Sequence, residues 1–150
     1  MRAVVTRVKS ASVTIEGKVN GEIGQGYLVL LGVGPEDTEA VAEKLAEKIV
    51  HLRVFEDEQG RMNRDIAAVG GRILVVSQFT LYADTAHGRR PGFSGAARPD
   101  LALPLYERVV ASLRQKLGEG RVGTGRFGAD MKVRLLNDGP FSVELKAGVA

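Results

Sequence analysis

The chain has 150 residues, 44% of them apolar and 26% charged, with a formal net charge of +3 and a pI of about 9.4. These values are typical of one globular domain, here spanning residues 1–150, and its mildly basic charge permits a polyanionic partner without requiring one. Cysteine is absent, which excludes disulfides and thiolate metal sites. With no apolar run near the ~20 residues that cross a bilayer and no signal-peptide core at the start, we expect a cytoplasmic protein without a membrane partner.

The first 33 residues are predicted to form a meander of strands. Residues 2–9 and 12–23 mix apolar and polar side chains with strand-like alternation, and Glu16-Gly17 is a hairpin turn signal. Residues 27–33 are continuously apolar, which is typical of a central strand. Arg7 lies inside the first predicted strand, where the pattern alone favours a solvated side chain.

Two amphipathic helices are predicted. Asp37 is a suitable N-cap for a helix of about 14 residues, because apolar residues recur at helical spacing up to position 52. The second helix spans 101–117, where leucine or valine returns every four residues, and Gly118 and Gly120 end it.

The segment 71–84, GRILVVSQFTLYAD, is predicted to be a strand buried on both faces. Its apolar run stops abruptly at the four residues Ser77, Gln78, Phe79 and Thr80, all of which except Phe79 are polar. Hydroxyl and amide groups at the end of a rigid strand are one way to build a site. A strand that simply reaches the surface explains the same residues, and both interpretations stay open at this point.

The segment 85–99 is predicted to be a long irregular loop. It contains the densest group of basic side chains in the chain, namely His87, Arg89, Arg90 and Arg98. Such a loop is able to hold phosphates, but a solvated basic loop fits the composition equally well.

The C-terminal part is predicted to contain two strands, 131–137 and 141–145. The residues between them, up to Pro140, form a turn signal, Asn-Asp-Gly-Pro. The tail from residue 146 is expected to fray.

Few types of catalysis are compatible with these residues. Two isolated histidines and no cysteine make no usual zinc site, and neither the phosphate-loop nor the dinucleotide fingerprint is present, so we expect no metal and no cofactor. The hydroxyl of Thr80 has no evident base beside it, which makes it a weak nucleophile. Such a site would depend on backbone N–H groups, worth roughly 3–4 kcal/mol per well-placed donor, and on groups of the substrate.

Two motifs together resemble a known family. Residues 77–81, SQFTL, and 137–140, NDGP, match the SQxxL-type and NxGP motifs of the D-aminoacyl-tRNA deacylases. The resemblance continues through MRAVVTRVKSASV, GRRPGF, ARPDLALPLYE and TGRFGAD, and covers nearly the whole chain. It implies an α/β (α+β) single domain in which a curved, barrel-like, mainly antiparallel sheet carries two amphipathic helices outside, assembled as a homodimer. It also implies hydrolysis of the ester between a D-amino acid, or misplaced glycine, and the 3′-terminal adenosine of tRNA.

The resemblance also assigns roles to residues of this chain. Ser77, Gln78, Phe79 and Thr80 would form the catalytic wall, with either Thr80 or the substrate's ribose 2′-hydroxyl driving hydrolysis; we prefer the ribose because no base is present. Gly139-Pro140 would form a cis peptide that enters the partner subunit's site and excludes L side chains.

Four further positions follow from the same resemblance. Arg7 would clamp the Gly139-Pro140 segment, which reverses the solvated interpretation of this residue. Phe127 and Met131 would line the substrate pocket. Ser142 stands where the family usually has threonine; the hydroxyl is kept, so we expect its hydrogen bond to persist.

Two rival functions remain. The first is an RNA-binding module without catalysis that uses the basic loop 86–98. The second is a hydrolase for small D-amino acid esters, which would need no tRNA.

Overall fold

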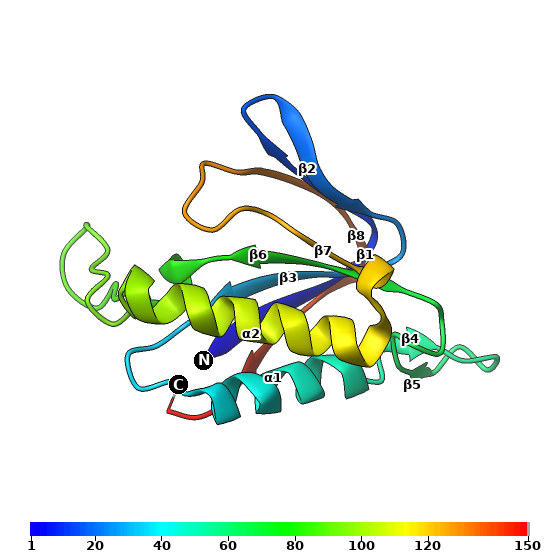
Figure 1. Cartoon of the computed structure of the whole chain (residues 1–150). Helices are drawn as coiled ribbons and strands as arrows, with labels where there is room; N and C mark the ends of the chain where they lie inside the picture. Colours follow the sequence, from blue (N-terminus) through cyan, green and yellow to red (C-terminus); the bar gives the residue numbers. More distant parts are fainter. Residues whose placement is uncertain (150) are drawn as a thin grey trace.

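The computed structural model describes residues 1–149. Helices α1 (Glu39–His51) and α2 (Pro99–Leu117) lie side by side over one face of a strongly curved sheet, so the predicted mixed α/β domain is confirmed (Figure 1). Across this part of the chain, no helix is long and apolar enough to cross a membrane.

The main sheet is curved until it nearly closes. Its order is β2-β1-β3-β6-β7, with β8 also paired to β1, and its strands are β1 (Arg2–Ile15), β2 (Lys18–Ile23), β3 (Gly26–Gly32), β6 (Arg72–Ser77), β7 (Val122–Thr124) and β8 (Lys132–Lys146). Only the β3–β6 and β6–β7 pairs are parallel, and the other strand pairs in the described residues are antiparallel. Asn20 Nδ2 on β2 donates a hydrogen bond to Thr124 O on β7, at 2.9 Å, which brings the two ends of the order together.

The remaining elements are short. Strands β4 (Phe55–Glu56) and β5 (Met62–Arg64) form a separate small hairpin, and the 3₁₀ turns are η1 (Phe79–Tyr82) and η2 (Glu119–Arg121).

The predicted breaks in the first and last strands are wrong. Residues 2–9 and 12–15 belong to the single strand β1, and the turn expected at 137–140 lies inside the single strand β8. β1 and β8 pair with each other from Arg2–Lys146 to Thr14–Lys132, and two register shifts between Ser142 and Leu136 absorb the irregular segment. Turn signals are local, so they do not anticipate a neighbouring strand that pairs on both sides of the turn.

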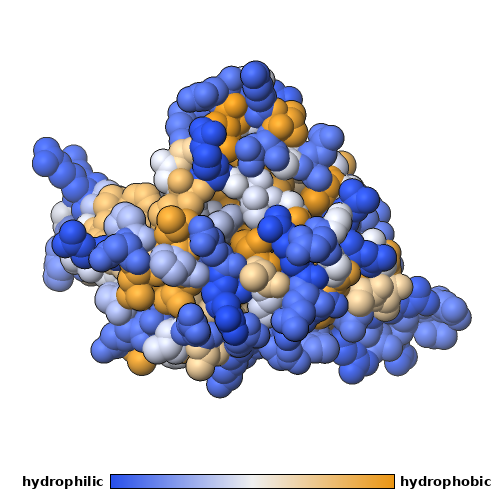
Figure 2. Space-filling model, viewed as in Figure 1, coloured by the Kyte–Doolittle hydropathy of each residue, from blue (hydrophilic) through white to orange (hydrophobic). Residues whose placement is uncertain are grey.

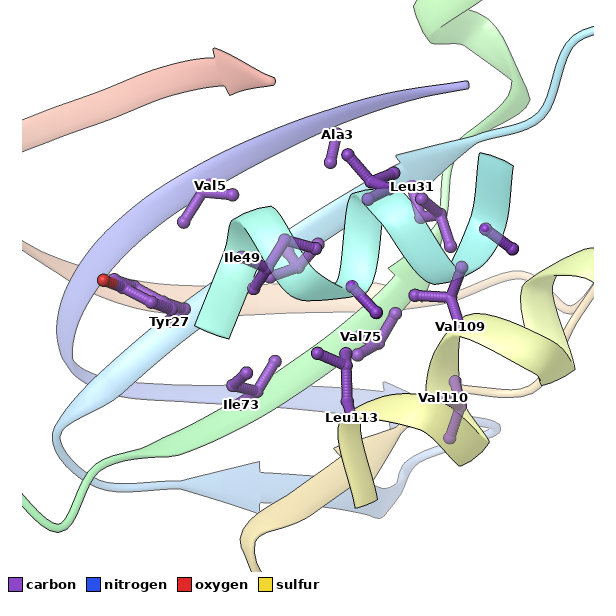
Figure 3. Close-up of a cluster of buried hydrophobic side chains, with 14 of the residues drawn as sticks. Ala3, Val5, Tyr27, Leu31, Ile49, Ile73, Val75, Val109, Val110 and Leu113 are labelled. Carbon is purple, nitrogen blue, oxygen red and sulfur yellow. The ribbon is translucent and has the colours of Figure 1, made fainter. Parts of the chain in front are cut away.

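Two apolar cores hold the sheet in place. The larger lies between the sheet and the helices, where Val5, Tyr27 and Ile73 from the strands face Ile49 and Leu113 from the helices (Figure 3). The smaller core lies on the other face of the sheet; its buried members are Val8, Ala11, Val13, Ile23, Leu28, Leu74 and Val76. Because β3 and β6 contribute to both cores, their continuously apolar sequences are explained.

The predicted start of the first helix and the predicted fraying of the C-terminal tail both differ from the structure. The N-cap of α1 is Thr38, whose side chain accepts from Val41 N, and Asp37 is instead buried against the ammonium group of Met1, at 2.8 Å. Ala147 does not fray: its N–H donates to Met1 O, and its side chain is buried. Residue 150, the end of the tail that was expected to fray, lies outside the described residues.

Candidate active site

Strand β6 delivers the SQFTL segment to the surface from a rigid base. Its apolar residues are buried between β3 and β7, and Ser77 is its last residue, opposite Leu31 of β3. Gln78 N donates to Leu31 O at 2.7 Å, after which the chain turns into η1. Ser77 and Gln78 are half-buried, whereas Phe79 and Thr80 are exposed. The four predicted residues therefore stand together, with their backbone positioned by a buried strand.

A second group of residues holds η1 from behind, and sequence reasoning did not identify it. Arg2 Nη1 donates to Leu81 O at 3.0 Å, and the guanidinium lies 4.6 Å from the centre of the Tyr82 ring. This ring rests on two glycines: a Cβ at Gly32 or Gly34 would come within 3.2 Å of its atoms. Burial raises the pKa of Tyr82 to about 12. The two glycines near the end of β3 are the feature of the sequence that could have indicated a large side chain packed against the backbone there.

Thr80 has an amide as its neighbour rather than a base. Gln78 Nε2 contacts Thr80 Oγ1, and no other side-chain partner of this hydroxyl is present among residues 1–149. His51 lies on α1, where it pairs with Glu47 at 2.8 Å. An amide takes no proton at neutral pH, so nothing in the described chain converts the Thr80 hydroxyl into a strong nucleophile.

The NDGP segment is held by a buried arginine. Arg7 is 8% exposed, so its solvated interpretation is wrong. Its Nε donates to Asp138 O at 2.9 Å, its Nη1 donates to Val54 O, and its guanidinium lies 5.0 Å from the centre of the Phe141 ring. The structure thus places Arg7 under the segment that the resemblance assigns it to hold.

Two side-chain hydrogen bonds complete this arrangement. Phe141 N donates to Asn137 Oδ1 at 2.7 Å, and the hydroxyls of Thr6 and Ser142 are 2.8 Å apart. The hydrogen bond expected of Ser142 is therefore present without the methyl group of threonine. The peptide bond between Gly139 and Pro140 is cis.

The two motifs do not meet within one chain. Ser77 shares a row of the sheet with Leu31 and Ala3, whereas Gly139-Pro140 lies beside Thr6 and Val8, further along β1. They are also separated by three strand spacings, or about 14 Å along the sheet. Within one chain, the two motifs therefore lie at separate places on the sheet.

Phe127 and Met131 pack against different cores of the sheet. Phe127 packs 5.9 Å from the centre of the Tyr106 ring and lines a cavity of about 530 Å³ beside α2. Met131 packs against the smaller core. A second cavity, of about 660 Å³, lies at the other end of the sheet, where it is lined by Ser10, Ala11, Ser12, Glu22, Ile23, Gly24, Arg72, Arg134, Leu135 and Leu136. None of the predicted site residues lines it.

The chain is similar to known proteins over nearly its full length. Residues 4–146 match the family model described as D-Tyr-tRNA(Tyr) deacylase. Proteins named D-aminoacyl-tRNA deacylase are 56% identical in Roseiflexus castenholzii (99% of this chain, 94% of the relative), 59% in Symbiobacterium thermophilum and 58% in Thermus aquaticus (95% and 93% for both).

Two solved structures have a fold similar to that of this chain. One described as a c-Myc DNA unwinding element binding protein has a TM-score of 0.94 at 40% identity, covering 99% of this chain and 100% of that one. Another, described as a probable eukaryotic D-amino acid tRNA deacylase, has a TM-score of 0.84 at 18% identity over 96% and 97% of the two chains.

Proposed function

The chain belongs to the D-Tyr-tRNA(Tyr) deacylase family, and from this we propose that it hydrolyses the ester bond of D-aminoacyl-tRNA and of mischarged glycyl-tRNA. The products are a free amino acid and reusable tRNA. The observation that carries the proposal is the family match over residues 4–146, which includes both motifs in the positions described above. We place the enzyme in the cytoplasm, where its substrate is found.

Hydrolysis at this site relies on backbone groups and on the substrate. The peptide groups of Phe79 and Thr80 follow a buried strand, so they are preorganised to face the reacting carbonyl. Among residues 1–149, the hydroxyl of Thr80 has the amide of Gln78 as its one side-chain partner, which supports the ribose 2′-hydroxyl as the group that assists the attack of water. The route needs no cofactor or metal.

A second copy of the chain completes the site. The Gly139-Pro140 half-site lies away from Ser77–Thr80 in one chain, and a twofold dimer would bring the two together twice. β8 pairs only with β1 among the described strands, and its Leu135 and Leu136 are exposed by 43% and 59%, which supports a homodimer. In this arrangement the carbonyls of the partner's Gly139 and Pro140 collide with an L side chain and leave room for hydrogen or a D side chain.

The test compares matched D- and L-aminoacyl-tRNA esters of the same amino acid. We expect free amino acid to be released from the D ester and from glycyl-tRNA, and the L ester to survive. Absence of cleavage at enzyme concentrations that saturate tRNA would refute hydrolysis. Equal cleavage of the D and L esters would refute the chiral collision while leaving hydrolysis intact.

Nucleic-acid binding without hydrolysis is the alternative function. The exposed basic side chains of loop 86–98 favour it, and one related structure is described as binding a DNA element. A protein that only binds nucleic acid would leave the ester intact even at enzyme concentrations that saturate the tRNA, so the same test separates the two functions.

A hydrolase for small esters would instead cleave simple D-amino acid esters that lack adenosine, which the ribose-assisted route does not.

A further inference from the structure

Two large aromatic side chains lie exposed beside the SQFTL segment. Phe79 is 57% exposed and Phe93 is 41% exposed, and their rings meet edge to face with centres 5.1 Å apart. They come from different elements, η1 and the loop that follows it. Exposed single apolar residues are common, but a paired aromatic surface next to a candidate active site offers flat faces to a ligand.

The loop that carries Phe93 has a fixed base. Asp84 and Gly92 exchange two backbone hydrogen bonds of 2.8 Å, and Ala97 N donates to Val33 O at 2.9 Å. The carboxylate of Asp84 also accepts from Ala86 N at 2.9 Å. The aromatic pair and the loop base are therefore held in position before any ligand binds.

The same loop carries cations that have no acidic partner. Arg89, Arg90 and Arg98 are exposed, and none of them takes part in an ion pair within residues 1–149. Figure 1 shows the loop projecting past the end of the sheet beside the start of α2, and Figure 2 shows strongly hydrophilic side chains at its far end. Unpaired guanidinium groups are suited to phosphate oxygens, because their planar donors bind them in pairs.

We propose that Phe79, Phe93, Arg89 and Arg90 form a binding surface for the unpaired 3′ strand of tRNA, a role that rests on the proposed function. Bases stack on the exposed aromatic faces and the arginines contact the phosphates between them, which is the usual chemistry of single-strand recognition. The terminal nucleotide then lies beside Ser77–Thr80, where its ester is cleaved. An extended strand suits this surface better than a duplex, because aromatic stacking requires unpaired bases.

The test compares two substrates that carry the same D-amino acid, a full tRNA and a single adenosine. In Phe93→Leu and in the double variant Arg89→Ala/Arg90→Ala, we expect kcat/KM on the tRNA to fall at least about tenfold more than on aminoacyl-adenosine. The double variant should also reduce the salt dependence of tRNA affinity, by about 0.7 in log–log slope for each phosphate that it no longer binds. Arg61→Ala, an exposed arginine on the β4–β5 hairpin, is the control and should change neither value.

Equal losses on both substrates would overturn the proposal, because they would indicate a disturbed catalytic site. A change in dimer dissociation measured by sedimentation, without a tRNA-specific loss, would overturn it in favour of a contact between subunits. If the unmodified protein cleaves neither substrate, the proposed function fails, and the binding surface is then judged by titration of uncharged tRNA. In that titration, unchanged affinity of the double variant would overturn the surface by itself.

Discussion

The two half-sites are built in opposite ways. The end of β6 has half-buried and exposed side chains on a backbone fixed by strand pairing, with Arg2 and Tyr82 supporting η1 from behind. The NDGP segment interrupts the regular pairing of β8 and is held by a polar clamp, in which Arg7 donates to two carbonyl groups. The first depends mainly on the sheet, whereas the second depends on side chains, chiefly the buried Arg7.

This difference separates two tasks of the proposed enzyme. A segment held by the sheet keeps its N–H groups in place, which suits stabilisation of developing charge. A segment held by side chains can be built away from regular geometry and still be rigid, which suits exclusion of the wrong enantiomer. Substitutions under β8 should therefore change the ratio of D to L cleavage, and substitutions behind η1 should change the rate on D substrates alone.

Arg7→Ala is expected to have the largest effect. It leaves the carbonyl groups of Asp138 and Val54 without their donor inside the protein, at a cost of about 3 kcal/mol in the free energy of unfolding. In the folded fraction, the displaced segment should lower the D-to-L ratio of kcat/KM by roughly 100-fold. Denaturant unfolding with a constant m-value and paired D and L assays measure the two effects.

Lys9→Ala is the matched control for this clamp. Its ammonium lies 3.6 Å from the Asp138 carboxylate, but the side chain is 59% exposed, so its loss should cost less than about 1 kcal/mol. If Arg7→Ala folds normally and retains its D-to-L ratio, the clamp does not control discrimination.

Arg2→Ala is the corresponding change behind η1, with a smaller effect. It removes the donor to Leu81 O and the cation over the Tyr82 ring, for which we expect about 2 kcal/mol of destabilisation. kcat on the D ester should fall roughly tenfold while the D-to-L ratio stays constant, because only the catalytic backbone shifts. A lowered ratio would mean that both half-sites discriminate, and the division of tasks would be wrong.

The two half-sites also differ in how well the sequence predicted them. The end of β6 could be predicted, because a continuous apolar run stops at Ser77 and such a run is recognised from neighbouring residues alone. The continuity of β8 through Pro140 could not be predicted, because it depends on pairing with β1, which lies more than 100 residues earlier in the chain. Arg7 shows the same limit: its pattern indicated a solvated residue, and only the family resemblance pointed to the clamp.

Thr80→Ala should have a smaller effect still on the β6 side. The hydroxyl contacts the amide of Gln78 and no base among the described residues, so we expect kcat/KM on the D ester to remain within about tenfold of the unmodified enzyme. Single-turnover assays with saturating enzyme measure this step directly. A loss far greater than tenfold would assign the attack to Thr80 and exclude the ribose-assisted route.

Tyr82→Phe is expected to have the smallest effect and sharpens the contrast with Arg7. Tyr82 Oη is buried without a hydrogen-bond partner among residues 1–149, so its removal should leave stability at pH 7 unchanged or raise it by up to about 1 kcal/mol. Denaturant midpoints measure this difference. A clear loss of stability at pH 7 would mean that the hydroxyl has a partner in solution, such as an ordered water molecule.

The same substitution should change how the protein responds to alkali. Burial raises the pKa of Tyr82 from its ordinary value near 10 to about 12, so the unfolded chain ionises first. Stability that is complete below pH 10 is therefore lost as the pH rises towards 12, and the variant should lose less of it than the unmodified protein. Tyr106, whose pKa is also raised to about 12 by burial, stays in both proteins and accounts for part of the remaining loss. Identical alkaline profiles would show that the ring is not buried against Gly32 and Gly34 in solution, and η1 would then depend on Arg2 alone.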